Sequence, residues 1–171
     1  MEQSVEVETE APLQTNIGTD QYLTFMLAGE EYGLDILNVQ EIKGWEGATP
    51  IPNTPDHVLG VINLRGTVAP IIDLRSCFHL AASDYSPTTV VIMVKAEGKE
   101  RDRVVGIVVD AVSEVYNVSM GDIEPPPPMG TVVSTEYIKG LATVGEKMII
   151  ILNISKMIDS EVSKEAYNQV D

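Results

Sequence analysis

The sequence predicts an all-β protein that consists of two small five-stranded β-barrel subdomains, related by an internal repeat, with a few short helices. Three observations support this prediction. Short β-prone runs alternate with clusters of Gly, Pro, Asn and Asp. Two stretches of the first half recur in the second half at fixed offsets. Helical periodicity is weak outside three short segments.

The strands are expected where β-branched and aromatic residues concentrate. The first run, residues 22–27, is followed by turn residues at 28–31, which predicts a hairpin. Weak helical patterns follow Leu74 and Ile154 and cover 34–42. The β-rich runs are residues 22–27, 32–36, 58–64, 67–74, 89–94, 103–109, 114–118, 138–144 and 147–152.

Two internal correspondences indicate a repeat. An offset of 80 aligns residues 58–61 with 138–141, and without a gap it aligns 71–74 with 151–154. An offset of 73 aligns Gly33-Leu34, Ile36, Val39 and Glu41-Ile42 with Gly106-Ile107, Val109, Val112 and Glu114-Val115. Because both correspondences occur in the same order, we infer two copies of one small β unit, each curled into a barrel to protect its edges.

The repeat sets the expected organisation of the chain. Asp73 and Asn153 each end a β-rich run before a short helical pattern, as N-cap residues do. The expected segments are a disordered acidic tail at 1–20, a first barrel at 21–83 with a helix at 153–165 packed against it, a second barrel at 84–152, and a flexible tail at 166–171.

Composition excludes several classes of protein. The formal charge of −15 repels nucleic acid and anionic membranes, so neither is expected as the main partner. The single cysteine, Cys77, excludes an intramolecular disulfide. The N-terminus lacks a secretory signal, and the longest unbroken apolar stretch, residues 148–152, is too short to span a bilayer. These features predict a cytoplasmic protein without direct membrane insertion.

No catalytic or metal-binding set stands out. His57 and His79 have no carboxylate or cysteine at ligand spacing, and Cys77 is expected to be a buried structural thiol. Phosphate-binding loops and hydrolase signatures are absent from the sequence. We therefore expect no enzymatic activity, metal or cofactor. A small β-barrel hydrolase that uses Asp and Glu is the remote alternative, and it would need convergent carboxylates.

The residues instead suggest protein binding. Arg65 lies at a predicted turn, and arginine is enriched at interfaces because its planar fork makes several hydrogen bonds, although an ordinary surface arginine also fits. Glu41 is a candidate partner for Arg65 or another base, or a solvated acid. Gly60, Gly106 and Gly140 lie inside strand patterns, which indicates close packing or a bulge.

Several motifs together closely resemble the CheW family of bacterial chemotaxis coupling proteins. The resemblance extends from about residue 22 to 158 and therefore covers nearly all of the chain outside its tails. The motifs lie at residues 30–36 (EEYGLDI), 39–42 (VQEI), 53–55 (NTP), 60–66 (GVINLRG), 70–75 (PIIDLR), 105–110 (VGIVVD) and 134–138 (STEYI).

The resemblance implies two five-stranded barrels around a shared core and a non-catalytic adaptor. Such an adaptor couples the cytoplasmic tips of transmembrane chemoreceptors to the regulatory domain of the histidine kinase CheA, so that receptors control autophosphorylation. The protein would be a monomer alone and would join membrane-associated arrays through its partners. A coupling protein of another chemosensory pathway, controlling twitching motility or a second messenger, remains open because the same groove would serve it.

The resemblance also implies candidate contact residues. Some relatives carry a basic residue and an aromatic residue at the ring contact, so the acid and methionine found here depart from that pattern. The receptor groove candidates are Val39, Glu41, Arg65, Val90, Gly106 and Gly140. The kinase-binding candidates are Thr49, Ile51 and Asn53, and the candidates for a second-barrel contact that closes rings with kinase domains are Glu124 and Met129.

Overall fold

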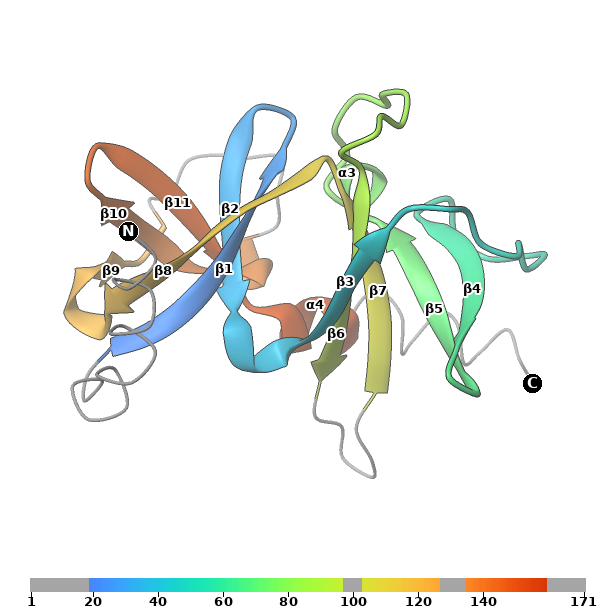
Figure 1. Ribbon diagram of the computed structural model, residues 1–171. Coiled ribbons are helices and arrows are strands. Elements are labelled where there is room, and N and C mark those ends of the chain that lie inside the picture. Colours follow the sequence, from blue (N-terminus) through green and yellow to red (C-terminus); the bar gives the residue numbers. More distant parts are fainter. Residues whose placement is uncertain (1–18, 97–102, 127–134, 160–171) are drawn as a thin grey trace.

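The computed structural model consists of two curled β-sheets with short helical segments (Figure 1). It describes residues 19–96, 103–126 and 135–159. The six-stranded sheet has the order β8-β1-β2-β11-β10-β9, and the five-stranded sheet has the order β3-β6-β7-β5-β4. The predicted all-β class with a few short helices is confirmed.

The elements have the following bounds. The six-stranded sheet contains β1 (Thr19–Leu27), β2 (Glu30–Asp35), β8 (Ala111–Ser119), β9 (Ile123–Glu124), β10 (Ile138–Val144) and β11 (Lys147–Leu152). The five-stranded sheet contains β3 (Val39–Gly44), β4 (Val58–Leu64), β5 (Thr67–Asp73), β6 (Val90–Ala96) and β7 (Arg103–Val109). The helical segments are η1 (Ile36–Asn38), α3 (Leu74–Cys77), η2 (Met120–Asp122), η3 (Thr135–Tyr137) and α4 (Ile154–Ile158).

The five-stranded sheet is continuous along the chain from β3 to β7, and the six-stranded sheet combines the strands on either side of it, an arrangement that differs from the predicted division at residues 83 and 84. Strands β1 and β2 pair with β8 and β11 from the far end of the chain, not with β3, β4 or β5. Each sheet contains one parallel pair, β5 with β7 and β2 with β11, and parallel strands need a long crossover connection; between β2 and β11 that connection includes the whole five-stranded sheet. Thr19 and Asp20, assigned to the tail, belong to β1, and residues 1–18 and 160–171 lie outside the described ranges.

The two sheets are nevertheless two copies of one arrangement. The predicted offsets place β2 and β3 on β7 and β8, and β4 and β5 on β10 and β11. The pairing agrees, since Ile71 lies opposite Gly106 in one parallel pair and Ile151 opposite Gly33 in the other. The predicted N-caps are confirmed: the Asp73 side chain accepts from the Arg75 amide, and that of Asn153 from the Lys156 amide.

Neither sheet closes into a barrel by continuous strand pairing in the described residues. In the five-stranded sheet, β3 and β4 are the end strands. The loop after β3 touches β4 through an isolated bridge, in which the amide of each of Thr49 and Val61 donates to the carbonyl of the other at 2.9 Å. The expectation of barrels therefore holds for the curvature of the sheets but not for closed ladders.

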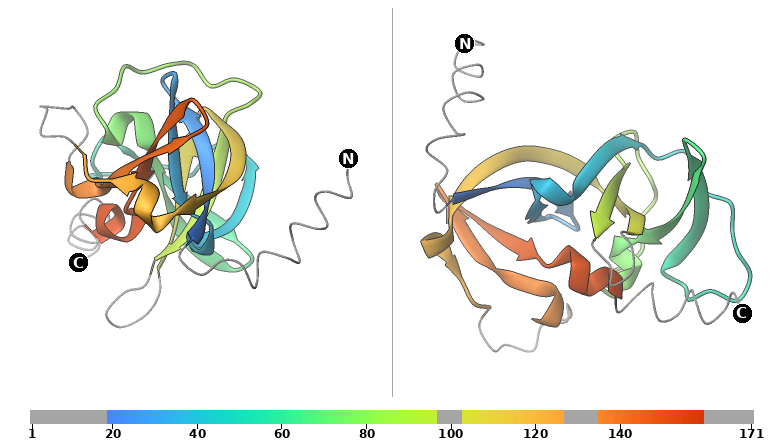
Figure 2. Two further views of the ribbon diagram at one scale, coloured as in Figure 1. Left: turned by 90° about the vertical axis from the view of Figure 1, so that its left-hand side faces the viewer. Right: turned by 90° about the horizontal axis from the view of Figure 1, so that it is seen from below.

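The main hydrophobic core lies between the sheets and belongs to both. Leu23, Phe25 and Leu34 contribute from the six-stranded sheet, and Ile92 and Ile107 from the five-stranded sheet. Helix α4 lies at the junction between the sheets (Figures 1 and 2) and adds Ile154, Met157 and Ile158 to this core. Each sheet also encloses a smaller cluster of its own. No helix in the described ranges is long and apolar enough to cross a membrane.

An ion pair also ties the sheets together. Arg75, in α3, donates from Nε and Nη2 to the two carboxylate oxygens of Asp110 at 3.0 and 2.8 Å. Asp110 is the residue between β7 and β8, where the chain passes from one sheet to the other. These hydrogen bonds lower the pKa of the Asp110 carboxyl, against the raising effect of burial, and the Ala28 amide lowers it further.

The lowered pKa predicts an acid-dependent contribution to stability. Because the folded pKa of Asp110 lies below its unfolded value of about 3.9, the stabilisation is fully present above that pH and is lost as the pH falls through the folded pKa. We expect Asp110→Asn to lower the urea midpoint at pH 7, and the difference from the unsubstituted protein to shrink below about pH 4. An equal difference at pH 7 and pH 3 would contradict this.

Gly60 gives a second prediction, because its backbone has a φ of +144° and a Cβ built there would lie 2.1 Å from the Thr49 carbonyl oxygen. Gly60→Ala should therefore break the Thr49–Val61 bridge and lower the free energy of unfolding by about 2 kcal/mol. Gly44→Ala is the matched control, because a Cβ at Gly44 meets nothing within 4 Å. Urea denaturation measures both, and equal losses would show that the close approach has no effect.

Candidate functional site

The turn between β4 and β5 presents Arg65 on the surface. Arg65 and Gly66 form a two-residue turn with φ values of 53° and 86°, and the Gly66 amide donates to the Asn63 side chain at 2.9 Å. These left-handed values suit a tight hairpin but disfavour a residue with a Cβ. The equivalent residue of the other copy, at an offset of 80, is Gly145 with a φ of 63°. The hairpin therefore does not need an arginine for its own geometry.

The Arg65 side chain reaches back to the edge strand β3. Its Nη1 donates to Glu41 Oε1 at 2.6 Å. The sequence left open whether Glu41 pairs with Arg65 or with another basic residue, and the structure pairs it with Arg65. The Glu41 side chain is 23% exposed, whereas that of Arg65 is 71% exposed. An ion pair this exposed contributes at most about 1 kcal/mol to stability. Its main effect is to hold an exposed guanidinium in a fixed position beside β3.

A β-bulge decides which way the side chains of β3 face. Val39 lies opposite Val94, but Glu41 lies opposite Met93, so the register shifts between them. Val94 belongs to the core between the sheets, whereas Met93 belongs to the cluster inside the five-stranded sheet. Val39 and Glu41 therefore lie on opposite faces of β3, which simple alternation does not predict.

The same bulge places Ile42 beside the other apolar groove candidates. Ile42 lies opposite Ile92, a residue of the core between the sheets, and is 41% exposed. Val39 and Val90 are half-buried against that core. Sequence reasoning overlooked Ile42 because only the bulge brings residues 39 and 42 to one face. At the offset of 73 the other copy has Val115, which is 46% exposed, so both copies expose an apolar residue at this place.

Gly106 and Gly140 do not lie on this surface. Both are buried, and they belong to different sheets. A Cβ at Gly106 would lie 2.5 Å from Ile71 Cδ1, and one at Gly140 would lie 2.5 Å from Ile123 Cγ2 and 2.7 Å from the Glu124 carbonyl oxygen. Their placement fits the packing role that a glycine inside a strand indicates, and neither contributes to the exposed surface beside Arg65.

The predicted kinase-binding residues lie together on the loop between β3 and β4. Thr49 is held against Val61 by the backbone bridge, and the Ile51 carbonyl accepts from the Thr54 hydroxyl at 3.1 Å. Ile51 is 40% exposed, and Asn53 is exposed with a φ of 64°. The loop is therefore anchored at one point and presents an apolar side chain outward.

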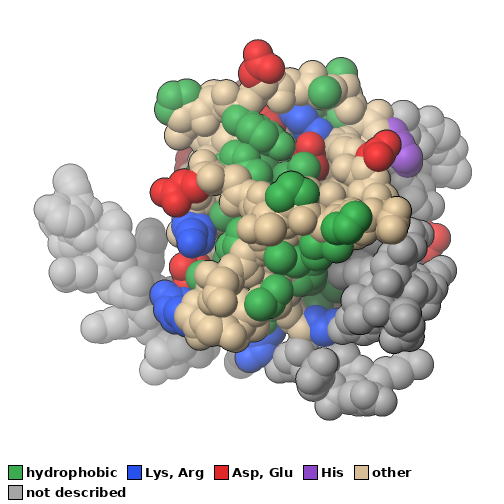
Figure 3. Space-filling model, turned by 90° about the vertical axis from the view of Figure 1, so that its right-hand side faces the viewer, with side chains coloured by type: hydrophobic (Ala, Val, Ile, Leu, Met, Phe, Trp, Pro, Cys, Tyr) green, Lys and Arg blue, Asp and Glu red, His purple; other side chains and the backbone are tan. Residues whose placement is uncertain are grey.

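Apolar side chains gather in a band across the end of the molecule formed by the five-stranded sheet (Figure 3). The exposed large apolar residues of this sheet and its loops are Ile42, Ile51, Val68 and Tyr85. Tyr85 makes an edge-on contact with Trp45, with 5.7 Å between ring centroids. Exposed apolar surface of this kind is typical of protein interaction sites.

The predicted ring-contact residues belong to the other sheet. Glu124, in the edge strand β9, is exposed and lies opposite Leu141. Glu124 corresponds to Thr49 in the other sheet. Glu124 pairs with Leu141 in β10, and Thr49 pairs with Val61, the residue of β4 that is equivalent to Leu141 at the offset of 80. Met129 lies outside the described residues.

The described residues contain no cluster of three or more His, Cys, Asp or Glu side chains that is able to hold a metal ion. Cys77 is buried, as expected of a structural thiol. Arg65 and Glu41 are paired with each other at the surface, and the exposed Arg65 guanidinium keeps further hydrogen-bond donors for a partner.

Comparison with known proteins identifies relatives of this chain. The family model described as the CheW-like domain matches residues 21–162. The chain is 47% identical over 141 residues to the chemotaxis protein CheW of Klebsiella aerogenes, covering 82% of each protein. It is 35% identical over 158 residues to CheW of Rhizobium meliloti, covering 92% of this chain and 99% of that protein. The crystal structure of the scaffolding protein TtCheW from Thermoanaerobacter tengcongensis matches with a TM-score of 0.74 and 38% identity, over 82% of this chain and 92% of that one.

The turn geometry predicts that Arg65 is dispensable for folding. Arg65→Gly removes an exposed ion pair but relieves a left-handed backbone, so we expect the free energy of unfolding to stay within about 1 kcal/mol of its original value. Gly66→Ala, in the same turn, is the control and should lose about 1 kcal/mol because it adds a Cβ at a φ of 86°. A loss above about 2 kcal/mol for Arg65→Gly in urea denaturation would make the ion pair structural.

Proposed function

This chain belongs to the CheW family of chemotaxis scaffold proteins, whose members are non-catalytic adaptors, and we propose that it couples chemoreceptors to the histidine kinase CheA. It would act in the cytoplasm at membrane-associated receptor arrays. The observation that carries the proposal is the exposed Arg65 guanidinium, fixed on Glu41 beside an edge strand, in a chain whose family membership extends over residues 21–162.

The receptor would dock as a helix along the outer edge of β3. Strand pairing in the described residues leaves one edge of β3 open, so a helix lying there can contact both faces of the strand. One face offers Val39 and Val90, which are half-buried against the core between the sheets, and the exposed Ile42. The other face offers Glu41 and Arg65. Apolar residues would supply contact area, and the guanidinium would orient the helix through directional hydrogen bonds.

The kinase regulatory domain would dock on the end of the five-stranded sheet. The anchored loop with Thr49, Ile51 and Asn53 lies there, together with the apolar band. Apolar contact would supply most of the affinity, because burial of apolar surface is favourable and largely independent of the chain's charge of −15. A further contact through Glu124 on β9 would serve ring closure with neighbouring kinase domains.

Receptor capture tests this assignment of Arg65. In a pull-down with receptor cytoplasmic fragments and CheA, Arg65→Gly should reduce receptor capture about tenfold, since it removes a central hydrogen-bonding group, and leave CheA capture unchanged. Arg65→Ala should behave in the same way and weaken receptor-dependent kinase activation. Full receptor capture and full coupling by both variants would show that Arg65 is not a receptor contact.

A reciprocal variant controls for general damage. Ile51→Asp places a charge in the apolar band and should reduce CheA capture while receptor capture persists. Loss of both captures in either variant would indicate one shared surface instead of two. Capture of neither partner by the unsubstituted protein would overturn the proposed function.

A further inference from the structure

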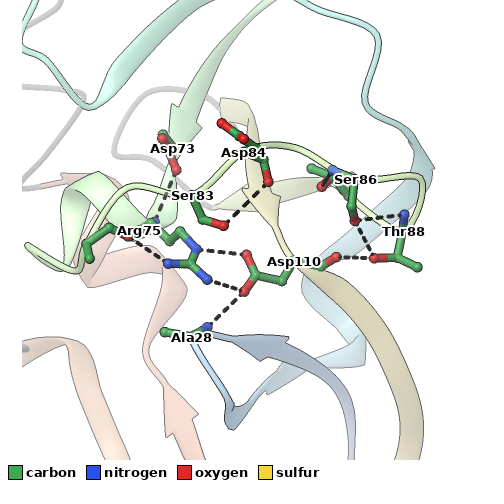
Figure 4. Close-up of polar contacts among 10 residues, drawn as sticks. Ala28, Asp73, Arg75, Ser83, Asp84, Ser86, Thr88 and Asp110 are labelled. Atoms are coloured by element: carbon green, nitrogen blue, oxygen red, sulfur yellow. Dashed lines mark hydrogen bonds and ion pairs between the residues drawn. The ribbon is translucent and has the colours of Figure 1, made fainter.

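Every backbone and side-chain polar atom of Asp110 is hydrogen-bonded, and Figure 4 shows the bonds to Arg75, Ala28 and Thr88. Its amide donates to the Met26 carbonyl at 3.1 Å, and its carbonyl accepts from the Thr88 hydroxyl at 3.0 Å. Its carboxylate accepts from Arg75 Nε and Nη2 and from the Ala28 amide, the last at 2.9 Å. A residue that is satisfied at every polar atom has one fixed position.

The partners of Asp110 come from separate parts of the fold. Met26 and Ala28 belong to the β1–β2 hairpin of the six-stranded sheet. Arg75 follows β5 of the five-stranded sheet, and its Nη1 also donates to the Ala81 carbonyl at 2.6 Å. Thr88 lies two residues before the start of β6. Asp110 therefore joins both sheets at the point where the chain passes between them.

The other passage between the sheets is held less firmly. It runs from β2 to β3 through η1, where the Asp35 side chain accepts from the Leu37 amide within the same connection. From this passage, Asn38 Nδ2 donates to the Lys95 carbonyl at 3.1 Å. Leu37, the counterpart of Asp110 at an offset of 73, is 86% exposed. The two copies thus differ most in how their passages are anchored.

Asp110 also lies beside the apolar wall of the proposed receptor groove. Val109, the preceding residue, lies opposite Val90 in the five-stranded sheet. Val112, two residues later, lies opposite Phe25 in the six-stranded sheet and is half-buried against the core between the sheets. A rotation of one sheet against the other about this point would move Val90 relative to Val112.

Apolar packing alone does not fix that rotation, because hydrophobic attraction is non-directional. A bidentate arginine–carboxylate pair has a defined geometry in addition to its energy. We propose that Asp110 and Arg75 are positioning residues for receptor docking: they set the angle between the two sheets and so the distance from Val90, on the proposed receptor surface, to Val112, with which the six-stranded sheet would extend that surface. The inference rests on the proposed function for its binding consequence, whereas the angle itself is a property of the free protein.

A distance measurement tests the angle without any partner. Spin labels at Val68→Cys in β5 and Met148→Cys in β11 report on opposite sheets, at exposed positions related by the offset of 80. Cys77→Ala removes the cysteine that is not to be labelled. We expect one narrow distance distribution by double electron–electron resonance, and a broader or shifted one in Asp110→Asn. Arg75→Lys, which keeps the charge but loses the planar fork, should give a smaller change in the same direction.

A matched control separates positioning from stability. Ile71→Val removes one methylene group from the cluster inside the five-stranded sheet, so it should lower the urea midpoint without changing the label distances. Receptor-fragment binding is then measured by calorimetry on the same variants. We expect the dissociation constant to rise about tenfold for Asp110→Asn and to stay unchanged for Ile71→Val.

The outcomes are distinct. Unchanged distances in Asp110→Asn and Arg75→Lys would overturn the inference, and Arg75→Lys decides alone if Asp110→Asn does not fold. Altered distances with unchanged receptor affinity would also overturn the positioning role. If the unsubstituted protein binds no receptor fragment, the proposed function fails, and the positioning role with it, while the distances still decide whether Asp110 holds the sheets.

Discussion

The parallel pairing of β5 with β7 and of β2 with β11 is the constraint on which the rest of the structure depends. The pairing of β2 with β11, together with that of β1 with β8, joins the two ends of the chain in the six-stranded sheet, whereas the five-stranded sheet is continuous from β3 to β7. The core between the sheets is consequently shared, with Phe25 from one sheet packed in the same cluster as Ile107 from the other. Surfaces on either sheet are thereby presented by one body.

The sequence predicted the repeat but not how its copies interlock. The offsets of 80 and 73 match observed strands, and the N-caps at Asp73 and Asn153 hold because capping is local. The choice of strand partners is non-local, so sequence patterns did not place β1 and β2 beside β8 and β11. Closed barrels were also expected, because a small sheet must protect its edges. In the five-stranded sheet, the end strands β3 and β4 are instead linked by the bridge at Thr49 and by the ion pair of Arg65 with Glu41.

The candidate site was predictable where it depended on residue type and not where it depended on backbone register. Arg65 and Glu41 stood out as a turn arginine and a possible partner, and they are paired. The bulge in β3 has no recognisable sequence signal, and it separates Val39 from Glu41 and brings Ile42 beside Val39. Gly106 and Gly140 show the converse limit, since close packing and contact with a partner both favour glycine and only burial distinguishes them.

Differences between the two copies indicate function more directly than their similarities do. The shared features, such as the paired glycines and the parallel register, are required by the architecture and would persist in any adaptor or enzyme built on it. The arginine at position 65 is not required, because the equivalent turn forms with Gly145 at lower conformational cost. The same holds for Asp110, since its counterpart in the other passage between the sheets is Leu37, which is 86% exposed. A residue that the fold does without in one copy and keeps in the other, at a conformational or desolvation cost, is best explained by something outside the fold. In this chain both such residues border the surface assigned to the receptor.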